Sequence, residues 1–149
     1  MTNEQTSARI AIRELIDRYH AAINHRDWTM LATLFAPDAI WQALAPIDLR
    51  FDGHGAVLAG LRASVLRQEL LVQASSGLII DLDDADTASV QSTLIEFGRE
   101  SGTGTGWSAI AFYSDTVRRL GDDWRFARRT LRVRYMGELA VTGRVADAP

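Results

Sequence analysis

The sequence contains no cysteine and no lysine, and all sixteen of its basic residues are arginine. The lack of thiols excludes disulfides, thiolate nucleophiles and cysteine-ligated zinc or iron–sulfur sites. The lack of lysine excludes Schiff-base chemistry, covalent attachment of pyridoxal phosphate and the lysine of a phosphate-binding P-loop. These two absences exclude many enzyme classes, and we expect no cofactor of these kinds.

Long apolar runs and a strong net charge are also missing. The apolar residues, 47% of the chain, lie in short segments, and none approaches the roughly 18 consecutive apolar residues of a membrane helix. The polar start lacks the basic and apolar regions of a signal peptide. A formal net charge of −3 gives no general attraction to phosphate backbones. We expect a cytoplasmic protein that binds neither membranes nor nucleic acids.

The length of 149 residues, without a linker-like run or an internal repeat, suits one domain. A chain of this size buries about 68–70% of its unfolded surface. We therefore expect a single domain over 1–149 with its core at about 8–136. The tail, 137–149, has little periodicity and many small residues, and we expect it to be partly mobile.

Apolar spacing predicts three helices in the first half of the chain. Apolar residues recur at threes and fours from Ile12 to Ile23, which indicates a helix over 7–25. Asp27 is typical of the cap of a short second helix, ended by Pro37 and Asp38 and followed by a strand over 39–44. A third apolar stripe, from Val57 to about Leu70, follows two glycines.

The period then changes to that of strands. Four segments are rich in β-branched and aromatic residues and are separated by polar or glycine-containing turns; they are 71–82, 87–99, 107–120 and 124–136. Consecutive strands of this kind favour an antiparallel meander. Helices followed by a meander indicate the α+β fold class.

Several local motifs, taken in order, carry a family resemblance. They are Arg18-Tyr19, Arg26-Asp27-Trp28, Leu34 to Ala39, the helix start from Gly53 to Val57, Tyr113-x-Asp115-x-x-Arg118, and Trp124-Arg125-Phe126. From about 10 to 134 the chain resembles the SnoaL-like branch of the nuclear-transport-factor-two-like superfamily, which includes scytalone dehydratase, polyketide cyclases, ketosteroid isomerase and hexachlorocyclohexane dehydrochlorinase. The resemblance implies a cone-shaped α+β barrel, with three N-terminal helices packed on a curved, mostly antiparallel sheet and an apolar pocket between them.

The acid–base residues of such relatives are missing at the matching positions. The resemblance implies an Asp near the end of the first helix and a His at the start of the strand after the third helix, where this chain has Asn24 and Gln73. A carboxamide exchanges no proton near neutral pH. We expect Asn24, Gln73, Tyr19 and Tyr113 to orient or polarise a substrate carbonyl. A register shift that puts a neighbour of Gln73 at the His position stays open.

The three histidines do not form an expected metal site. His20 and His25 are five residues apart, about 140° around a helix, and do not converge. His25, beside Arg26 and Asp27, is typical of a solvated helix end, and His54 between two glycines is typical of a turn or cap. No carboxylate joins them at ligand spacing, so we expect no metal.

Glu96 shares one strand face with Ser92 and Leu94. If that face is concave, burial raises the pKa of Glu96, which could then act as a general acid or base. The alternative is a salt bridge to an arginine of a neighbouring strand on the outer face. The residues expected to line the pocket are Ile23, Trp41, Leu94 and Glu96.

The last strand alternates Arg128, Thr130, Arg132 and Arg134 with Arg129, Leu131, Val133 and Tyr135. One face of it is therefore expected to be largely solvated. The resemblance makes the back of the sheet a common subunit interface, where arginines pair across the contact. We expect a homodimer or a higher homo-oligomer.

Three functions remain open. The first is a cofactor-independent lyase or isomerase acting on a small hydrophobic cyclic or polyketide-like molecule. The second is a non-catalytic protein that binds a hydrophobic small molecule, and the third is an assembly subunit resembling the β subunit of ring-hydroxylating dioxygenases. A cavity holding Gln73 and a titratable neighbour favours catalysis, a cavity without one favours binding, and a filled core with a broad exposed apolar patch favours assembly.

Overall fold

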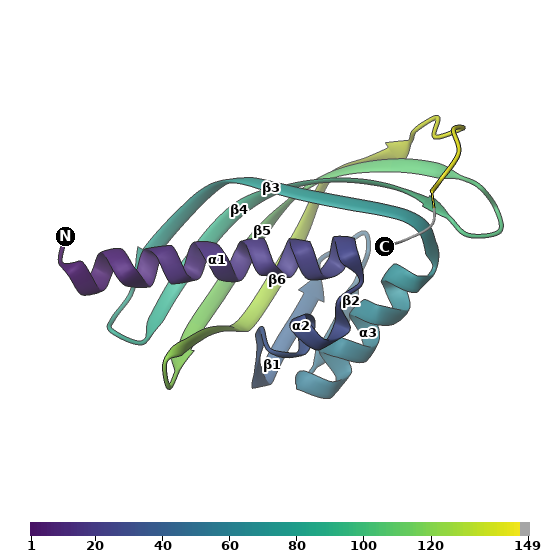
Figure 1. The fold of residues 1–149 in the computed structure, drawn as a ribbon. Coiled ribbons are helices and arrows are strands. Elements are labelled where there is room, and N and C mark those ends of the chain that lie inside the picture. The colour runs from purple at the N-terminus through teal and green to yellow at the C-terminus, as the bar shows by residue number, and fades with distance from the viewer. Residues whose placement is uncertain (147–149) are drawn as a thin grey trace.

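A curved sheet wraps over a long helix in the computed structural model, which describes residues 1–146 (Figure 1). The elements are α1 (Asn3–His25), α2 (Trp28–Ala32), β1 (Phe35–Ala43), β2 (Leu49–Asp52), α3 (His54–Leu66), β3 (Gln68–Leu82), β4 (Thr87–Glu100), β5 (Gly106–Leu120) and β6 (Asp123–Glu138). The strand order is β2-β1-β6-β5-β4-β3. Among the strands that the structure describes, only the β1–β6 pairing is parallel. The α+β class and the meander are confirmed. No helix within 1–146 is long and apolar enough to cross a membrane.

Helix α1 begins earlier than its apolar stripe indicates. Thr2 and Gln5 form a capping box, in which Thr2 Oγ1 accepts from the Gln5 backbone N at 3.1 Å and Gln5 Oε1 accepts from the Thr2 N at 2.9 Å. The first turns are polar, so periodicity alone places the start too late. At the other end Asp27 caps α2 as expected, accepting from the Met30 N at 2.9 Å.

The segment after α2 differs from expectation. Helix α2 ends at Ala32, and β1 begins at Phe35 instead of Ala39. Pro37 lies inside β1, in the stretch where the register with β6 shifts between Phe35 and Ile40. A proline lacks the N–H that a regular ladder needs, and an irregular stretch tolerates it. Helix α3 likewise ends at Leu66, so Leu70 belongs to β3.

Helix α1 covers the edge strand β3. Arg9 donates to the Ile80 carbonyl, and Arg26 donates to the Gln68 carbonyl. Between them Asn24 accepts from the Gln73 backbone N at 2.8 Å and donates to the Gln73 carbonyl at 2.9 Å. An unprotected edge strand is a template for pairing with another chain. These contacts bind α1 to main-chain groups of β3 and fix how the helix lies under the sheet.

The core lies between α1 and the concave face of the sheet. The predicted stripe of α1 is buried, including Ile12, Ile16 and Ile23. It meets buried residues of the sheet such as Leu94 and Phe126. Strand residues that alternate in phase with these core residues therefore lie on the same concave side of the sheet.

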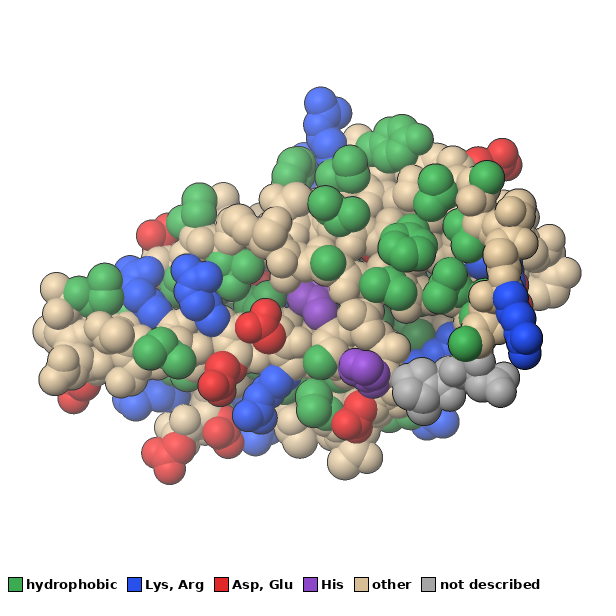
Figure 2. All heavy atoms as spheres, turned by 45° about the horizontal axis from the view of Figure 1, so that its top comes forward, with side chains coloured by type: hydrophobic (Ala, Val, Ile, Leu, Met, Phe, Trp, Pro, Cys, Tyr) green, Lys and Arg blue, Asp and Glu red, His purple; other side chains and the backbone are tan. Residues whose placement is uncertain are grey.

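The outer face carries a group of exposed apolar side chains, here called the convex patch; its members are Val72, Ile95, Phe97, Ile110, Phe112 and Tyr135. Several are direct cross-strand neighbours, because Ile95 pairs with Ile110 and Ile110 with Tyr135. Figure 2, which turns this side toward the viewer, shows hydrophobic side chains gathered over the sheet.

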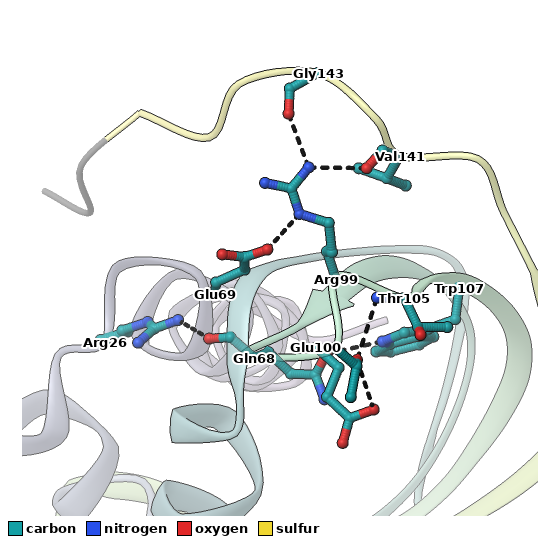
Figure 3. A network of polar contacts seen from close by, with 10 residues as sticks. Arg26, Gln68, Glu69, Arg99, Glu100, Thr105, Trp107, Val141 and Gly143 are labelled. Atoms are coloured by element: carbon teal, nitrogen blue, oxygen red, sulfur yellow. Dashed lines mark hydrogen bonds and ion pairs between the residues drawn. The ribbon is translucent and has the colours of Figure 1, made fainter.

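The segment after β6 is held by one arginine. Arg99 Nη1 donates to the carbonyls of Val141 at 2.8 Å and Gly143 at 2.7 Å, and the same guanidinium contacts Glu69 (Figure 3). Strand β6 itself continues to Glu138. The expected mobility of 137–149 falls partly on 147–149, which lie outside the described residues. These contacts reach as far as Gly143, and the mobility of the tail stays a prediction.

Candidate functional site

Polar side chains lie under the concave face of the sheet, among core residues that are otherwise apolar. Helix α1 contributes Tyr19 and His20, both buried. The facing strands contribute Trp41 from β1, Gln73 from β3, Glu96 from β4, Tyr113 and Asp115 from β5, and Arg129 from β6. They form two adjoining clusters. The first consists of His20, Gln73 and Glu96, and the second of Tyr19, Trp41, Tyr113, Asp115 and Arg129.

The first cluster is a hydrogen-bonded relay from His20 through Gln73 to Glu96. Gln73 and Glu96 are register partners on β3 and β4, so their side chains project from the same face. Gln73 Nε2 donates to Glu96 Oε2 at 2.8 Å, and Gln73 Oε1 lies 3.2 Å from His20 Nδ1. The Gln73 amide thus lies between the imidazole of His20 and the carboxylate of Glu96 and hydrogen-bonds to both.

Burial sets the ionisation of this relay. Burial, together with the nearby charge of Arg129, lowers the pKa of His20 to about 4, against the opposing hydrogen bond to Gln73. Burial raises the pKa of Glu96, against the opposing hydrogen bond from Gln73. At neutral pH the imidazole is therefore neutral.

The second cluster joins two phenols. The hydroxyls of Tyr19 and Tyr113 are 3.4 Å apart, and Trp41 Nε1 donates to the Tyr113 hydroxyl at 3.3 Å. Tyr19 is 1% exposed and Tyr113 2% exposed. Burial raises the pKa of each phenol, against the opposing charge of Arg129. Both phenols therefore stay protonated at neutral pH and can donate hydrogen bonds.

Arg129 and Asp115 form a fully buried ion pair beneath these rings. They are register partners on β6 and β5. Arg129 Nε donates to Asp115 Oδ1 at 2.9 Å and Nη2 donates to Oδ2 at 3.0 Å, a bidentate pairing. The Arg129 Cζ lies 4.2 Å from the ring centre of Tyr19, 3.7 Å from Tyr113 and 4.3 Å from Phe126.

Burial and the charge of the partner act in opposite directions on the pKa of each member of this pair. Burial raises the pKa of Asp115, while Arg129 holds it down. Burial lowers the pKa of Arg129, but Asp115 and the two tyrosines outweigh that effect and raise it. Arg129 Nη1 is buried and has no hydrogen-bond partner within residues 1–146. It is a cationic donor with no acceptor in the described protein.

The structure brings together three of the four residues expected to act on a carbonyl. Tyr19 and Tyr113 touch, and Gln73 is the centre of the relay. Asn24 differs, because its amide is occupied by both main-chain groups of Gln73. Asn24 therefore holds α1 against β3 and fixes the position of Gln73.

The four residues expected to line a pocket all lie on the inner side. Ile23, Trp41 and Leu94 are buried. Glu96 is on the concave face with Ser92 and Leu94, which agrees with the first of the two alternatives. The salt-bridge alternative is wrong, because the partner of Glu96 is the amide of Gln73.

Sequence reasoning missed His20, Asp115 and Arg129 as site residues. Each sits at an apolar position of its element's period: His20 is four residues after Ile16, Asp115 alternates with Val117, and Arg129 alternates with Leu131. A charged or titratable residue at such a position was the available signal. The other two histidines lie as expected, His25 exposed and His54 bonded to the Ala32 carbonyl at 2.8 Å.

The inner space is closed around the second cluster. Tyr19 and Tyr113 are almost wholly inaccessible, and Arg129 is 0% exposed, so these side chains fill space in which a pocket was expected. Gln73 and Glu96 are half-buried. Two surface hollows lie elsewhere, one of about 370 Å³ between α2 and α3 and one of about 810 Å³ beside the start of α1. Neither is lined by the two clusters.

Comparison with solved structures agrees with this fold. A hexachlorocyclohexane dehydrochlorinase, LinA-type3 from Novosphingobium barchaimii, is 20% identical and superposes with a TM-score of 0.85 over 96% of this chain and 97% of its own. A candidate scytalone dehydratase from Novosphingobium aromaticivorans is 22% identical, with a TM-score of 0.85 over 99% and 96%. A Nostoc punctiforme protein of unknown function with a cystatin-like fold is 21% identical, with a TM-score of 0.69 over 84% and 90%.

These superpositions establish a shared fold, and at identities this low the activity has to be argued from the site. No protein with a curated description is significantly similar to this chain in sequence. The family profile of the SnoaL-like domain matches residues 4–130, which is most of the chain and includes both clusters. The protein thus belongs to the SnoaL-like domain family and has the nuclear-transport-factor-two-like fold.

Proposed function

We propose that this chain is a cofactor-independent lyase or isomerase that removes a proton from carbon in a small hydrophobic cyclic or polyketide-like molecule. The observation that carries the proposal is Arg129, fully buried beside Tyr19 and Tyr113 with Nη1 lacking a partner within 1–146. Leaving a buried donor unsatisfied costs about 1–3 kcal/mol. A ligand oxygen that accepts from Nη1 removes that penalty.

The groups around Arg129 suit a developing oxygen anion. Tyr19 and Tyr113 remain protonated and offer phenolic hydroxyls, and Arg129 supplies a fixed positive charge. Donors fixed in advance where charge develops are a large source of rate enhancement. Gln73 orients the substrate from β3, Asn24 keeps Gln73 in place, and Ile23, Trp41 and Leu94 form the apolar wall.

Access is through the half-buried end of the site. Gln73 and Glu96 are partly exposed, whereas Tyr113 and Arg129 are closed off. A substrate therefore enters beside β3 and displaces side chains toward the second cluster. Two structural neighbours, a dehydrochlorinase and a candidate dehydratase, are named for reactions of the lyase class.

Proton exchange tests the proposal without knowledge of the natural substrate. β-Tetralone, a flat cyclic ketone, is incubated with the protein in deuterium oxide and its deuterium content is followed by mass spectrometry. We expect the wild type to accelerate exchange over buffer and Tyr113→Phe to slow it at least tenfold. Tyr135→Phe is the matched control, because Tyr135 is 53% exposed on the convex patch. Binding without exchange would favour the non-catalytic binding protein.

The convex patch supports a second candidate role in assembly. A filled interior combined with a broad exposed apolar surface is what we expect of an assembly subunit. We propose that the patch makes a homodimer or higher homo-oligomer of this chain. Replacing Phe97 and Phe112 together by Glu is expected to yield monomers in light scattering. Ile10→Glu, at a residue of α1 that is 56% exposed, is expected to leave the mass unchanged. Equal masses for both variants contradict this role.

A further inference from the structure

The relay determines which nitrogen of His20 carries hydrogen. Gln73 Nε2 donates to Glu96 Oε2 at 2.8 Å, and the opposite amide orientation would set the Gln73 oxygen against a carboxylate. The amide oxygen therefore faces His20 Nδ1, 3.2 Å away, and accepts from it. A neutral imidazole has one N–H. With the hydrogen on Nδ1, Nε2 holds a free lone pair.

That lone pair is buried and unused. His20 is 6% exposed, and Nε2 has no hydrogen-bond partner within 1–146. The groups that face the ring are Arg129 from β6, Tyr19 on the same helix at 5.3 Å between ring centres, and Glu96 from β4 through Gln73. Native proteins satisfy nearly all buried polar atoms. An exception at a fixed tautomer, beside an arginine whose Nη1 also lacks a partner, indicates a place for a ligand.

We propose that His20 is the proton-transferring residue of this chain and that Gln73 is a positioning residue, which holds His20 in the Nδ1–H tautomer and connects it to Glu96. This inference rests on the proposed function and assigns its base. It also specifies the substrate class as carbon acids, molecules with a C–H bond beside a carbonyl. In this arrangement the histidine lies on α1 and the carboxylate on β4, so neither occupies position 24 or 73.

The proposed step moves one proton and needs no oxidant or reductant. The C–H bond breaks, its proton forms a bond to His20 Nε2, and its electron pair remains on the substrate as an enolate. The enolate oxygen accepts from Arg129 Nη1, while the Nδ1–H of the new imidazolium stays on Gln73. Return of the proton to another carbon completes an isomerisation. Its transfer to a departing hydroxide, with formation of C=C, completes a dehydration.

The tautomer can be measured in the protein without any ligand. In protein labelled with nitrogen-15 histidine, the His20 signals are identified by their loss in His20→Gln. We expect a pyrrole-like Nδ1 and a pyridine-like Nε2 at neutral pH. Gln73→Leu removes the acceptor and is expected to mix the two tautomers. A wild-type Nε2 that carries hydrogen overturns the inference.

The exchange of β-tetralone tests the chemical role. General acid–base catalysis contributes roughly 10²–10⁴-fold, so His20→Gln is expected to slow exchange about a hundredfold or more. Gln73→Leu is expected to lower kcat more than it changes KM. His25→Gln, an exposed residue at the end of the same helix, is the control and keeps the wild-type rate.

The outcomes separate the two proposals. No exchange by the wild type counts against the proposed function, and the nitrogen-15 spectrum then decides the state of His20 alone. Exchange by the wild type with His20→Gln within about twofold of it overturns the assignment of His20 and leaves the function standing. If His20→Gln does not fold, the wild-type pH profile decides: we expect the rate to fall on protonation of a group with a pKa of about 4. A profile without that limb overturns the assignment.

Discussion

Arg129 is held by charge along one edge and by aromatic rings over its faces. Asp115 binds two of its nitrogens, and Tyr113 and Phe126 lie within 4.3 Å of its Cζ. Removal of one member of a buried ion pair is far more damaging than the net contribution of the intact pair, because the other charge is left uncompensated in a medium of low polarity.

Asp115→Ala is therefore expected to lower the free energy of unfolding by about 3–5 kcal/mol. Urea titration followed by circular dichroism measures it. Asp38→Ala is the matched control, since Asp38 also pairs with an arginine, Arg118, but at the surface. We expect the control to leave the midpoint nearly unchanged. Equal effects of the two variants would contradict the role given to burial.

His20 makes stability depend on pH. Its folded-state pKa of about 4 lies below the ordinary 6.5, so between these values the unfolded state binds more protons than the folded state. Stability is complete above pH 6.5 and is lost as the pH falls toward 4. The loss is on the order of 3 kcal/mol.

Replacing His20 by Gln is expected to remove this part of the acid sensitivity. Glu96, whose pKa is raised, acts in the opposite direction, so the difference between variant and wild type is the quantity to measure. Urea midpoints at several pH values provide it, with His25→Gln as the control. Parallel curves for wild type and His20→Gln would show that His20 does not titrate as proposed.

At the scale of elements, the contact between α1 and β3 does two things. It satisfies main-chain groups of the edge strand, and it sets His20 opposite Gln73. Asn24 is central to both, because its amide has one donor and one acceptor matched to the main chain of Gln73. An aspartate at this position keeps the acceptor and loses the donor.

Asn24→Asp is therefore expected to destabilise the fold by about 1–3 kcal/mol at neutral pH, because a carboxylate faces the Gln73 carbonyl. The carbonyl raises the pKa of the new Asp, and below that pKa its protonated oxygen can donate again. The penalty should shrink as the pH falls. Asn3→Asp, at the exposed start of α1, serves as the control. A penalty independent of pH contradicts this account of the contact.

The elements themselves were largely predictable from the sequence, for a physical reason. Helix α1 and the four strands of the meander each bury one face, so the spacing of their apolar residues, such as Ile12, Ile16, Leu94 and Val117, predicts them. The predictions of the start of α1 and of the extent of β1 were wrong, because these bounds depend on a capping box at Thr2 and on tertiary pairing around Pro37. Neither leaves an apolar period.

The site was only partly predictable. Tyr19, Tyr113 and Gln73 could be named by periodicity and family resemblance, whereas the alternation around Glu96 left open which side of the sheet it faces. The role of Asn24 could not be predicted, because a hydrogen bond between a side chain and a distant main chain has no sequence pattern. His20 and Arg129 were missed for a different reason: His20 was considered only as a metal ligand, and Arg129 was placed on the strand face of Leu131 without being assigned a role.

At the scale of the molecule, the sheet separates two surfaces of different character. Its concave side holds the two polar clusters under α1, and its convex side presents the apolar patch.

Closure around Tyr113 and Arg129 implies that α1 or the surrounding side chains move when a ligand binds. Hydrogen exchange of α1 amides is expected to slow when β-naphthol, an enol mimic, is added, whereas unchanged α1 protection with bound β-naphthol would contradict entry beneath α1.

The rate of deuterium incorporation into β-tetralone, measured side by side for wild type, Tyr113→Phe and His20→Gln at neutral pH, tests the central claim most directly. The account predicts acceleration over buffer by the wild type and its loss in both variants, with the fold of each confirmed by circular dichroism. A wild-type rate equal to that of buffer, or equal rates in all three proteins, would contradict it.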